Sequence, residues 1–459
     1  MKKTLFLLLF AWSSLNICAQ IAGDWHGVLD VKGTKLTIVF HFNNENGVYK
    51  GTMDSPDQSA NGIPLTSIAL KDSTVNVQIA SAMAEYEGKW DGKSIKGTFK
   101  QIGMSFPLNL ETGVLKRNRP QEPSAPYPYE VEEVTFQNKK DSISLAGTLT
   151  LPKGKGQFPS VIMITGSGPE NRDEEIYDHK PFWIIADYLT RKGIAVLRYD
   201  DRGFGKSGGV FKGATTSDFA VDVEAAVSYL KSRTDINKNK IGLIGHSEGG
   251  IIASMVASAN KKIAFIVLLA GPGVTGEKIM VQQVTDLCAD SVAREKVKPI
   301  LKIYTQSTDI LRQYPGESAR QQLQKLYNDN QTEICNNLNL TKEQGNMYVN
   351  SMTEQFMSPW FRNFLFLDPA DYLVKVHCPV LALNGVLDKQ VRAEENLNGI
   401  KEALQKGGNK SIETIAIPGM NHLFQECKTG QLAEYAVIEQ TFSPKALELI
   451  GEFITRVTK

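Results

Sequence analysis

From residue 130 onward, the chain alternates short apolar runs with amphipathic helical segments. Six runs are predicted to be buried strands: 160–165, 195–199, 241–244, 264–270, 380–383 and 413–417. Helical patterns lie between the first four of these runs, at 182–192, 218–232 and 250–257. Strands joined by helical crossovers pair in parallel and need helices on both faces. The alternation therefore predicts an α/β fold with a mostly parallel sheet and helices on both faces.

Residues 275–370 interrupt this alternation between two of the predicted strands. They carry amphipathic helical patterns and no strand pattern, and a structureless loop of that length is improbable in a compact domain. We therefore expect a helical cap insertion at about 275–370. The cap would belong to a domain that runs from residue 130 to residue 459.

The chain before residue 130 has a different pattern. Residues 20–113 consist of short alternating runs with hairpin signals at Asn46-Gly47 and Asp91-Gly92, which predict a small antiparallel all-β domain, a barrel or a sandwich. Residues 114–129 contain four prolines among charged residues and are predicted to be a linker. Two domains are also what a length of 459 residues favours.

Residues 1–19 are typical of a secretory signal peptide. Lys2 and Lys3 precede a short apolar run, and small residues lead to Cys18-Ala19, so we expect cleavage near Ala19. The apolar run is too short to cross a bilayer, and no stable membrane span is expected. The protein is therefore predicted to be secreted or periplasmic. A lipoprotein is less favoured, because Ile17 is bulky where a small residue usually precedes the modified cysteine.

Charge and cysteine content narrow the possible partners. Lys and Arg total 51 against 50 Asp and Glu, and the chain has no long basic run, so nucleic-acid binding is not predicted. No Cys/His spacing typical of a metal site occurs. Four cysteines after the leader are scattered and define no disulfide framework: Cys288, Cys335, Cys378 and Cys427. The sequence carries no signal for an oligomeric state.

Two glycine-rich segments could mark chemistry, and one has the right context. Residues 203–209 contain partial matches to dinucleotide, phosphate and esterase motifs but continue as a loop, so we interpret them as a turn. Gly245-His246-Ser247-Glu248-Gly249 instead follows a predicted strand and precedes a predicted helix. A serine in such a sharp turn stands above the sheet edge, where flanking side chains would collide. Ser247 is the predicted nucleophile.

A serine nucleophile needs a base, and in this strand–turn–helix arrangement the acid and the base follow the serine in the chain. Of the histidines after Ser247, His377 lies at the wrong end of a predicted strand, whereas His422 follows the last strand. His422 is the predicted base. Asp388 follows the strand 380–383 and is predicted to orient the imidazole and to stabilise its protonated form.

Two backbone N–H groups are candidates for an oxyanion hole. The Glu248 N–H lies at the predicted helix start, and the loop after strand 160–165 supplies the second donor. We favour the Ser167 N–H, with Gly168 as the alternative. Four apolar side chains at the end of the predicted cap are candidates for binding substrate: Met352, Phe356, Trp360 and Phe361. Such a run is also typical of plain core packing.

Five segments of the sequence together resemble one known family: 165–173, 179–182, 198–203, 245–250 and 358–361. Over about residues 130–459, the chain is similar to the EstD-like bacterial carboxylesterases of the α/β-hydrolase superfamily. The resemblance implies an α/β-hydrolase fold and ester hydrolysis by a Ser-Asp-His triad, with no metal or organic cofactor. The triad positions fall on Ser247, Asp388 and His422. The β domain resembles an N-terminal extension found on some of these proteins.

The sequence thus predicts a serine carboxylesterase that acts on a small-molecule ester with a small or medium acyl group. A thioesterase, an acyltransferase or a serine aminopeptidase on the same fold stays open, because the triad does not fix the acyl donor. A non-catalytic cell-envelope binding protein is less favoured, since all three triad positions are filled. We also expect a fragment that begins near Tyr129 to fold and to hydrolyse small esters.

Overall fold

The computed structural model describes residues 21–459, except 32–33, 59, 102–103, 114–117 and 289–290. The chain divides into two compact units, residues 1–116 and residues 117–459. The predicted signal peptide lies outside the described residues, as do the first four residues of the predicted linker. Within the described ranges, no helix is long and apolar enough to cross a membrane.

The first unit is one antiparallel sheet of nine strands in the order β4-β3-β2-β1-β9-β8-β7-β6-β5. The strands are β1 (Gly23–Val31), β2 (Thr34–Glu45), β3 (Val48–Ser55), β4 (Ala60–Pro64), β5 (Ser67–Lys71), β6 (Thr74–Ile79), β7 (Ala84–Trp90), β8 (Ser94–Gln101) and β9 (Met104–Thr112). Leu65 N donates to Gly51 O in β3 and Thr66 N donates to Gln78 O in β6, so the chain between β4 and β5 draws the sheet edges together. The predicted antiparallel all-β domain is confirmed as a curled, half-barrel sheet.

Alternating side chains of this sheet fill its core. Trp25, Phe40, Phe42 and Tyr86 are buried inside it, which is the structural role that aromatic residues at strand spacing usually have. The predicted hairpin at Asn46-Gly47 joins β2 to β3, and both residues have positive φ, as a tight two-residue turn requires.

The second unit contains an eight-stranded sheet in the order β10-β11-β13-β12-β14-β15-β16-β17. The strands are β10 (Glu130–Asn138), β11 (Ile143–Leu151), β12 (Phe158–Ile164), β13 (Ala195–Tyr199), β14 (Ile236–His246), β15 (Ile266–Leu269), β16 (Val380–Gly385) and β17 (Ile412–Ile417). β11 is antiparallel to β10 and β13, and the remaining pairs are parallel. The predicted mostly parallel sheet is confirmed.

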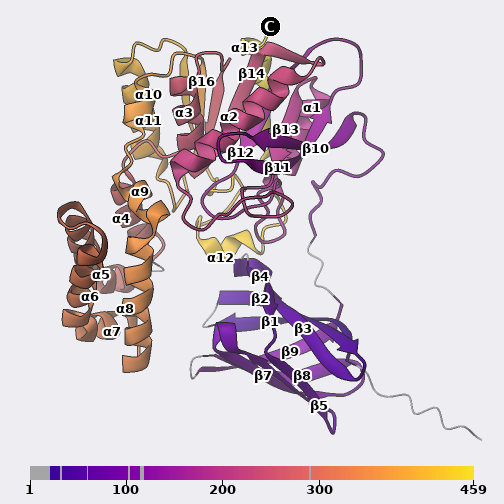
Figure 1. The fold of residues 1–459 in the computed structure, drawn as a ribbon, viewed down its shortest axis with the longest axis vertical. Coiled ribbons are helices and arrows are strands. Elements are labelled where there is room, and N and C mark those ends of the chain that lie inside the picture. The colour runs from indigo at the N-terminus through magenta and orange to yellow at the C-terminus, as the bar shows by residue number, and fades with distance from the viewer. Residues whose placement is uncertain (1–20, 32–33, 59, 102–103, 114–117, 289–290) are drawn as a thin grey trace, which may run out of the picture. The chain divides into compact units, whose positions relative to one another are not determined.

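Helices cover both faces of this sheet (Figure 1). These helices are α1 (Pro181–Arg191), α2 (Thr216–Ser232), α3 (Glu248–Ala259), α11 (Ala393–Lys406) and α13 (Pro444–Val457), while the short helix α12 (Leu432–Tyr435) lies in the segment between β17 and α13. Apolar side chains of α1 and α13 form one buried cluster with the sheet, and those of α2, α3 and α11 form another. Strand residues alternate between these clusters, so the strands are apolar on both sides.

The segment between β15 and β16 is helical, as the sequence predicts. Its helices are α4 (Gly276–Asp286), α5 (Ser291–Gln313), α6 (Gly316–Asp329), α7 (Gln331–Leu338), α8 (Lys342–Met357), α9 (Pro359–Phe366) and α10 (Ala370–Leu373). In Figure 1, α4 to α9 form a group of their own below the helices α3, α10 and α11. This group has its own apolar core, to which Leu323, Tyr327 and Phe356 contribute. We call α4 to α9 the cap.

Residues 118–129, within the predicted linker, are part of the second unit and are hydrogen-bonded to the rest of it. Arg119 donates to the carbonyl oxygens of Tyr177 (2.6 Å), Asp178 (3.3 Å) and Ile438 (3.0 Å). Gln121 donates to the Phe442 carbonyl (2.7 Å) and accepts the N–H groups of residues 441 and 442. These contacts tie residues 118–129 to the segment after β12 and to residues 438–442, which lie between α12 and α13. We call residues 118–129 the strap.

The strap leads to a prediction about where the second unit begins. A fragment of residues 129–459 lacks the six hydrogen bonds of Arg119 and Gln121, whereas a fragment of residues 117–459 keeps them. Since each such bond contributes about 0.5–1.5 kcal/mol net, the loss of all six should make the shorter fragment less stable by roughly 3–9 kcal/mol. Urea unfolding of the two fragments measures this difference.

The double variant Arg119→Ala, Gln121→Ala in the longer fragment is the matched control, because it removes the same hydrogen bonds without shortening the chain. It should lose most of the same free energy of unfolding. Equal stability of the two fragments would mean that the strap contributes nothing.

Candidate active site

The predicted nucleophile stands on a strained turn between β14 and α3. Ser247 alone makes the turn, with φ 52° and ψ −121°. Residues with a Cβ atom rarely adopt such conformations, which cost of order 1–3 kcal/mol each and occur mainly at functional sites. A Cβ on Gly245 would collide with the Gly249 carbonyl oxygen, and a Cβ on Gly249 would collide with the Ile164 carbonyl oxygen. The two glycines are therefore required by the close approach of α3 to β14 and β12.

A buried histidine–carboxylate pair lies on the loops that follow β16 and β17. His422 Nδ1 is 2.8 Å from Asp388 Oδ2, and the other Asp388 oxygen accepts the N–H groups of Gln390 (2.7 Å) and Val391 (2.8 Å). Asp388 follows β16 and His422 follows β17, so both loops leave the carboxyl edge of the sheet. The carboxylate accepts a hydrogen bond from the Nδ1–H group, which leaves Nε2 of His422 pointing away from Asp388.

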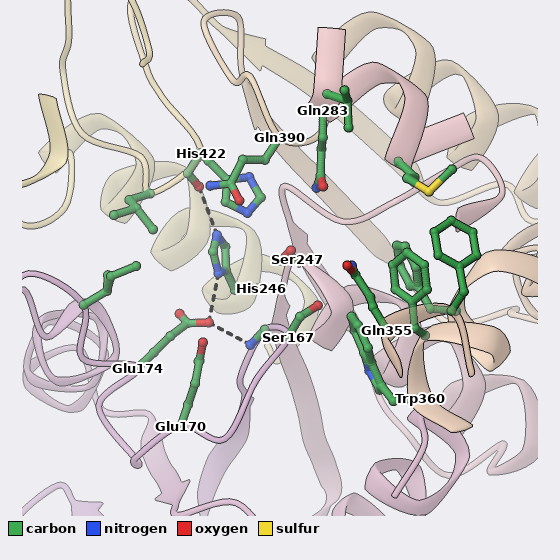
Figure 2. Close-up of a pocket in the computed structure, with 18 of the residues that line it drawn as sticks. Ser167, Glu170, Glu174, His246, Ser247, Gln283, Gln355, Trp360, Gln390 and His422 are labelled. Atoms are coloured by element: carbon green, nitrogen blue, oxygen red, sulfur yellow. Dashed lines mark hydrogen bonds and ion pairs between the residues drawn. The ribbon is translucent and has the colours of Figure 1, made fainter. Parts of the chain in front are cut away.

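Ser247 and His422 line the same cavity of about 400 Å³. Figure 2 shows Ser247 near the middle of this cavity, with His422 and Gln390 on one side and Gln355 and Trp360 on the other. The structure thus brings together the three residues predicted from the sequence as nucleophile, acid and base. A cavity of this size is at the lower end of the range for small-molecule sites.

Two backbone donors flank the nucleophile. Gly166 N–H donates to Glu174 Oε1 at 2.9 Å, so it is already occupied. The next residue, Ser167, lines the cavity. Glu248 begins α3, where the unpaired N–H groups and the helix dipole favour negative charge. The predicted oxyanion donors, Ser167 and Glu248, are therefore placed beside Ser247.

The cap supplies the apolar wall of the cavity. Its lining includes all four predicted substrate-binding residues: Met352, Phe356, Trp360 and Phe361. Phe356 and Phe361 also belong to the apolar core of the cap, so these two side chains pack the cap and border the cavity together. Residues 352–361 therefore combine the two roles that the sequence allows, packing of an apolar core and lining of a pocket.

Trp360 also connects the cap to α3. Its Nε1 lies 3.0 Å from both carboxylate oxygens of Glu248, and the Thr216 hydroxyl donates to the same carboxylate at 2.7 Å. Burial raises the pKa of Glu248, and the hydrogen bonds from Thr216, Trp360 and Ser167 oppose that rise without cancelling it. The residue after the nucleophile therefore anchors the cap through its side chain.

A family model described as serine aminopeptidase, S33 matches residues 182–426, just over half of the chain. The chain belongs to this family. Esterase EstD of Thermotoga maritima is 27% identical over 298 residues, which are 64% of this chain and 61% of that esterase. The chain thus spans less than two thirds of this relative. The resemblance to EstD-like carboxylesterases that the motifs indicate is confirmed.

A comparison with solved structures matches an esterase of Pyrococcus furiosus, 19% identical, with a TM-score of 0.45 over 75% of this chain and 99% of that one. A hypothetical protein from Pseudomonas aeruginosa is 16% identical, with a TM-score of 0.44 over 75% of this chain and 98% of that one. The predicted α/β-hydrolase fold is confirmed by the sheet order of this chain, by its helical cap between β15 and β16, and by the family model.

This family member has three titratable side chains in its cavity that sequence reasoning does not identify: Glu170, Glu174 and His246. His246 precedes the nucleophile, so a search for a base after Ser247 passes over it. Its place inside the glycine pentapeptide is the one signal that could have indicated a role. Burial, with Glu174 and Asp201 nearby, raises the pKa of Glu170 well above its ordinary value, and its Oε2 is buried without a hydrogen-bond partner.

Residues that the sequence analysis set aside lie outside this site. The Ser207 hydroxyl donates to the Asp200 carbonyl at 2.6 Å and accepts the Ala146 N–H at 2.9 Å, so it holds a turn. His377 is exposed just before β16, at the other end of that strand. In the described parts of the chain, no group of three His, Cys, Asp or Glu side chains could hold a metal ion.

Two substitutions of Trp360 distinguish its place in the cavity wall from its hydrogen bond to Glu248. Trp360→Ala removes the indole from the cavity wall and from its stack on Phe364, so it should shift the preference toward longer acyl chains by at most about 1–3 kcal/mol per methylene. Trp360→Phe keeps a ring in the wall but removes the donor to Glu248. It should keep the chain-length preference and lose about 1–3 kcal/mol of stability.

The measurements are kcat/KM on p-nitrophenyl esters of increasing chain length and the free energy of unfolding in urea. Equal loss on every chain length for Trp360→Ala would mean that the indole only packs.

Proposed function

We propose that this chain is a serine carboxylesterase that hydrolyses small or medium acyl esters. The observation that carries the proposal is the pairing of a strained Ser247 turn with the buried Asp388–His422 pair on one small cavity. The similarity to the esterase EstD supports the choice of substrate class. The proposal includes export, because residues 1–19 are typical of a signal peptide.

The proposed reaction has two halves. Ser247 Oγ attacks the ester carbonyl while His422 Nε2 takes the hydroxyl proton, and the oxyanion accepts hydrogen bonds from the Ser167 and Glu248 N–H groups. His422 then gives the proton to the leaving alcohol, and the acyl group stays on Ser247. Water, deprotonated by His422, attacks the acyl-enzyme, and collapse returns the serine hydroxyl and releases the acid. Asp388 stabilises the imidazolium in both halves.

The charges around the cavity favour an ester over the N-terminal residue of a peptide. An aminopeptidase must hold a protonated amine, which needs an uncompensated carboxylate. Glu174 is paired with His246, and the Glu248 carboxylate accepts hydrogen bonds from Thr216 and Trp360. The pKa of Glu170 is raised by burial and by neighbouring carboxylates, so its neutral form is favoured. A neutral acyl group suits this cavity better.

Loss of each proposed triad residue should reduce turnover without unfolding the chain. Ser247→Ala and His422→Ala should lower kcat by several orders of magnitude, and Asp388→Asn by less, with losses that do not add when combined. Ser207→Ala is the matched control, since Ser207 also lies in a Gly-x-Ser-x-Gly segment but only holds a turn. Fluorophosphonate labelling and hydrolysis of p-nitrophenyl butyrate measure the effect. Retained labelling in Ser247→Ala would contradict the assignment.

Simple esters and an aminoacyl amide should separate the two candidate activities. We expect kcat/KM for p-nitrophenyl acetate and butyrate to exceed that for alanine p-nitroanilide by at least about a hundredfold, since the cavity offers no uncompensated carboxylate to the ammonium group. A Glu170→Gln variant tests the carboxyl that could still ionise and should change this ratio little. Faster hydrolysis of the anilide, lost in Glu170→Gln, would favour the aminopeptidase instead.

A further inference from the structure

Three loops that build the candidate active site meet at one side chain, His246. Its Nδ1 lies 2.9 Å from Glu174 Oε1, which also accepts the N–H of Gly166 at 2.9 Å. Its Nε2 lies 2.9 Å from the backbone carbonyl oxygen of His422. Figure 2 shows this chain of contacts running from His422 through His246 to Glu174 and the oxyanion loop. It connects the loops after β12, β14 and β17.

The partners of His246 define its charge. A neutral imidazole has one N–H donor and one acceptor nitrogen, whereas an imidazolium has two donors. Both groups facing His246 are acceptors, a carboxylate and a backbone carbonyl. Two hydrogen bonds are made only if both ring nitrogens carry protons. With Glu174 ionised, this geometry favours an imidazolium, and the adjacent Glu174 carboxylate supplies its counter-charge.

The electrostatic surroundings agree with this assignment. Burial lowers the pKa of His246, but the charge and hydrogen bond of Glu174, the His422 carbonyl and the Asp388 charge together raise it above its ordinary value. Glu170 borders the same cavity, and burial raises its pKa well above the ordinary value, while the His422 ring lies 4.7 Å from the His246 ring, centroid to centroid. Because the pKa of His246 is raised, its contribution to stability is complete below about pH 6.5 and is lost as the pH rises through the raised value.

We propose that His246, held as an imidazolium by Glu174, is a positioning residue that fixes the backbone of the base loop and of the oxyanion loop around Ser247. This inference rests on the proposed function, because it assigns His246 a part in the same reaction. Glu174 takes the Gly166 N–H and so leaves Ser167 as the next donor in the loop. The second N–H of His246 restrains the main chain of His422, whose side chain takes the serine proton.

The positive charge of His246 should affect the pH dependence of kcat/KM, which a residue that only packs would not do. A cation beside His422 makes protonation of the base harder, so its removal should make protonation easier. In His246→Gln, a neutral amide replaces the cation, and the acid limb of the kcat/KM profile should move to higher pH. The lost restraint should also lower kcat by about ten- to a hundredfold, with a smaller change in KM.

The test combines kinetics with a direct measurement of charge on the full chain. Profiles of kcat/KM for p-nitrophenyl butyrate from about pH 5 to 9 compare the wild type with His246→Gln, Glu174→Gln and, as a matched control, the exposed His377→Gln. Long-range ¹H–¹⁵N spectra of the six histidines report whether both ring nitrogens of His246 are protonated near neutral pH. Glu174→Gln removes the counter-charge and should shift only signals of this cluster.

We expect a doubly protonated His246 and an acid limb at higher pH in His246→Gln, with His377→Gln unchanged. A neutral His246 ring in the wild-type spectrum would overturn the proposal, and so would reduced kcat with an unmoved acid limb. The spectrum needs no folded variant and no turnover, so it decides even if His246→Gln does not fold. Absence of ester hydrolysis by the wild type would instead contradict the proposed function.

Discussion

The site depends on the close approach of α3 to the strands β12 and β14. At this contact, two glycines leave room for backbone carbonyls, and Ser247 adopts a left-handed conformation that its neighbours impose. Each of these strained features is stabilised by the packed sheet and helices around it, with apolar clusters on both faces. The energy of a large core is thus used to hold one serine in an unfavourable geometry.

The other parts of the site attach to this contact through polar groups. The loop after β12 and the loop after β17 meet the turn through His246, and the cap meets it through the Trp360–Glu248 hydrogen bond. The strap reaches the loop after β17 from the other side, through Arg119 and Gln121. Buried polar contacts of this kind are costly when incomplete, so they specify a single arrangement of the loops.

Much of the fold could be predicted because it follows from local pattern. Apolar runs with helical segments between them define the parallel sheet, and the strand–turn–helix context selects Ser247 over Ser207. Asp388 and His422 could be found from chain order and their place after strands. His246 could not, because its role comes from acceptors 72 and 176 residues away. The strap could not either, since its prolines resemble a free linker and its partners lie between 58 and 321 residues later.

The position of Trp360 gives the protein an internal optical signal. Within residues 117–459 the sequence contains two tryptophans, Trp183 on α1 and Trp360 at the cavity. The indole of Trp360 is in contact with a titratable carboxyl and lies at the junction of cap and turn. In a fragment of residues 117–459, its fluorescence should therefore respond to ligand entry or to any displacement of the cap, with Trp183 as the background. Cap movement during turnover could be followed in this way without an added label.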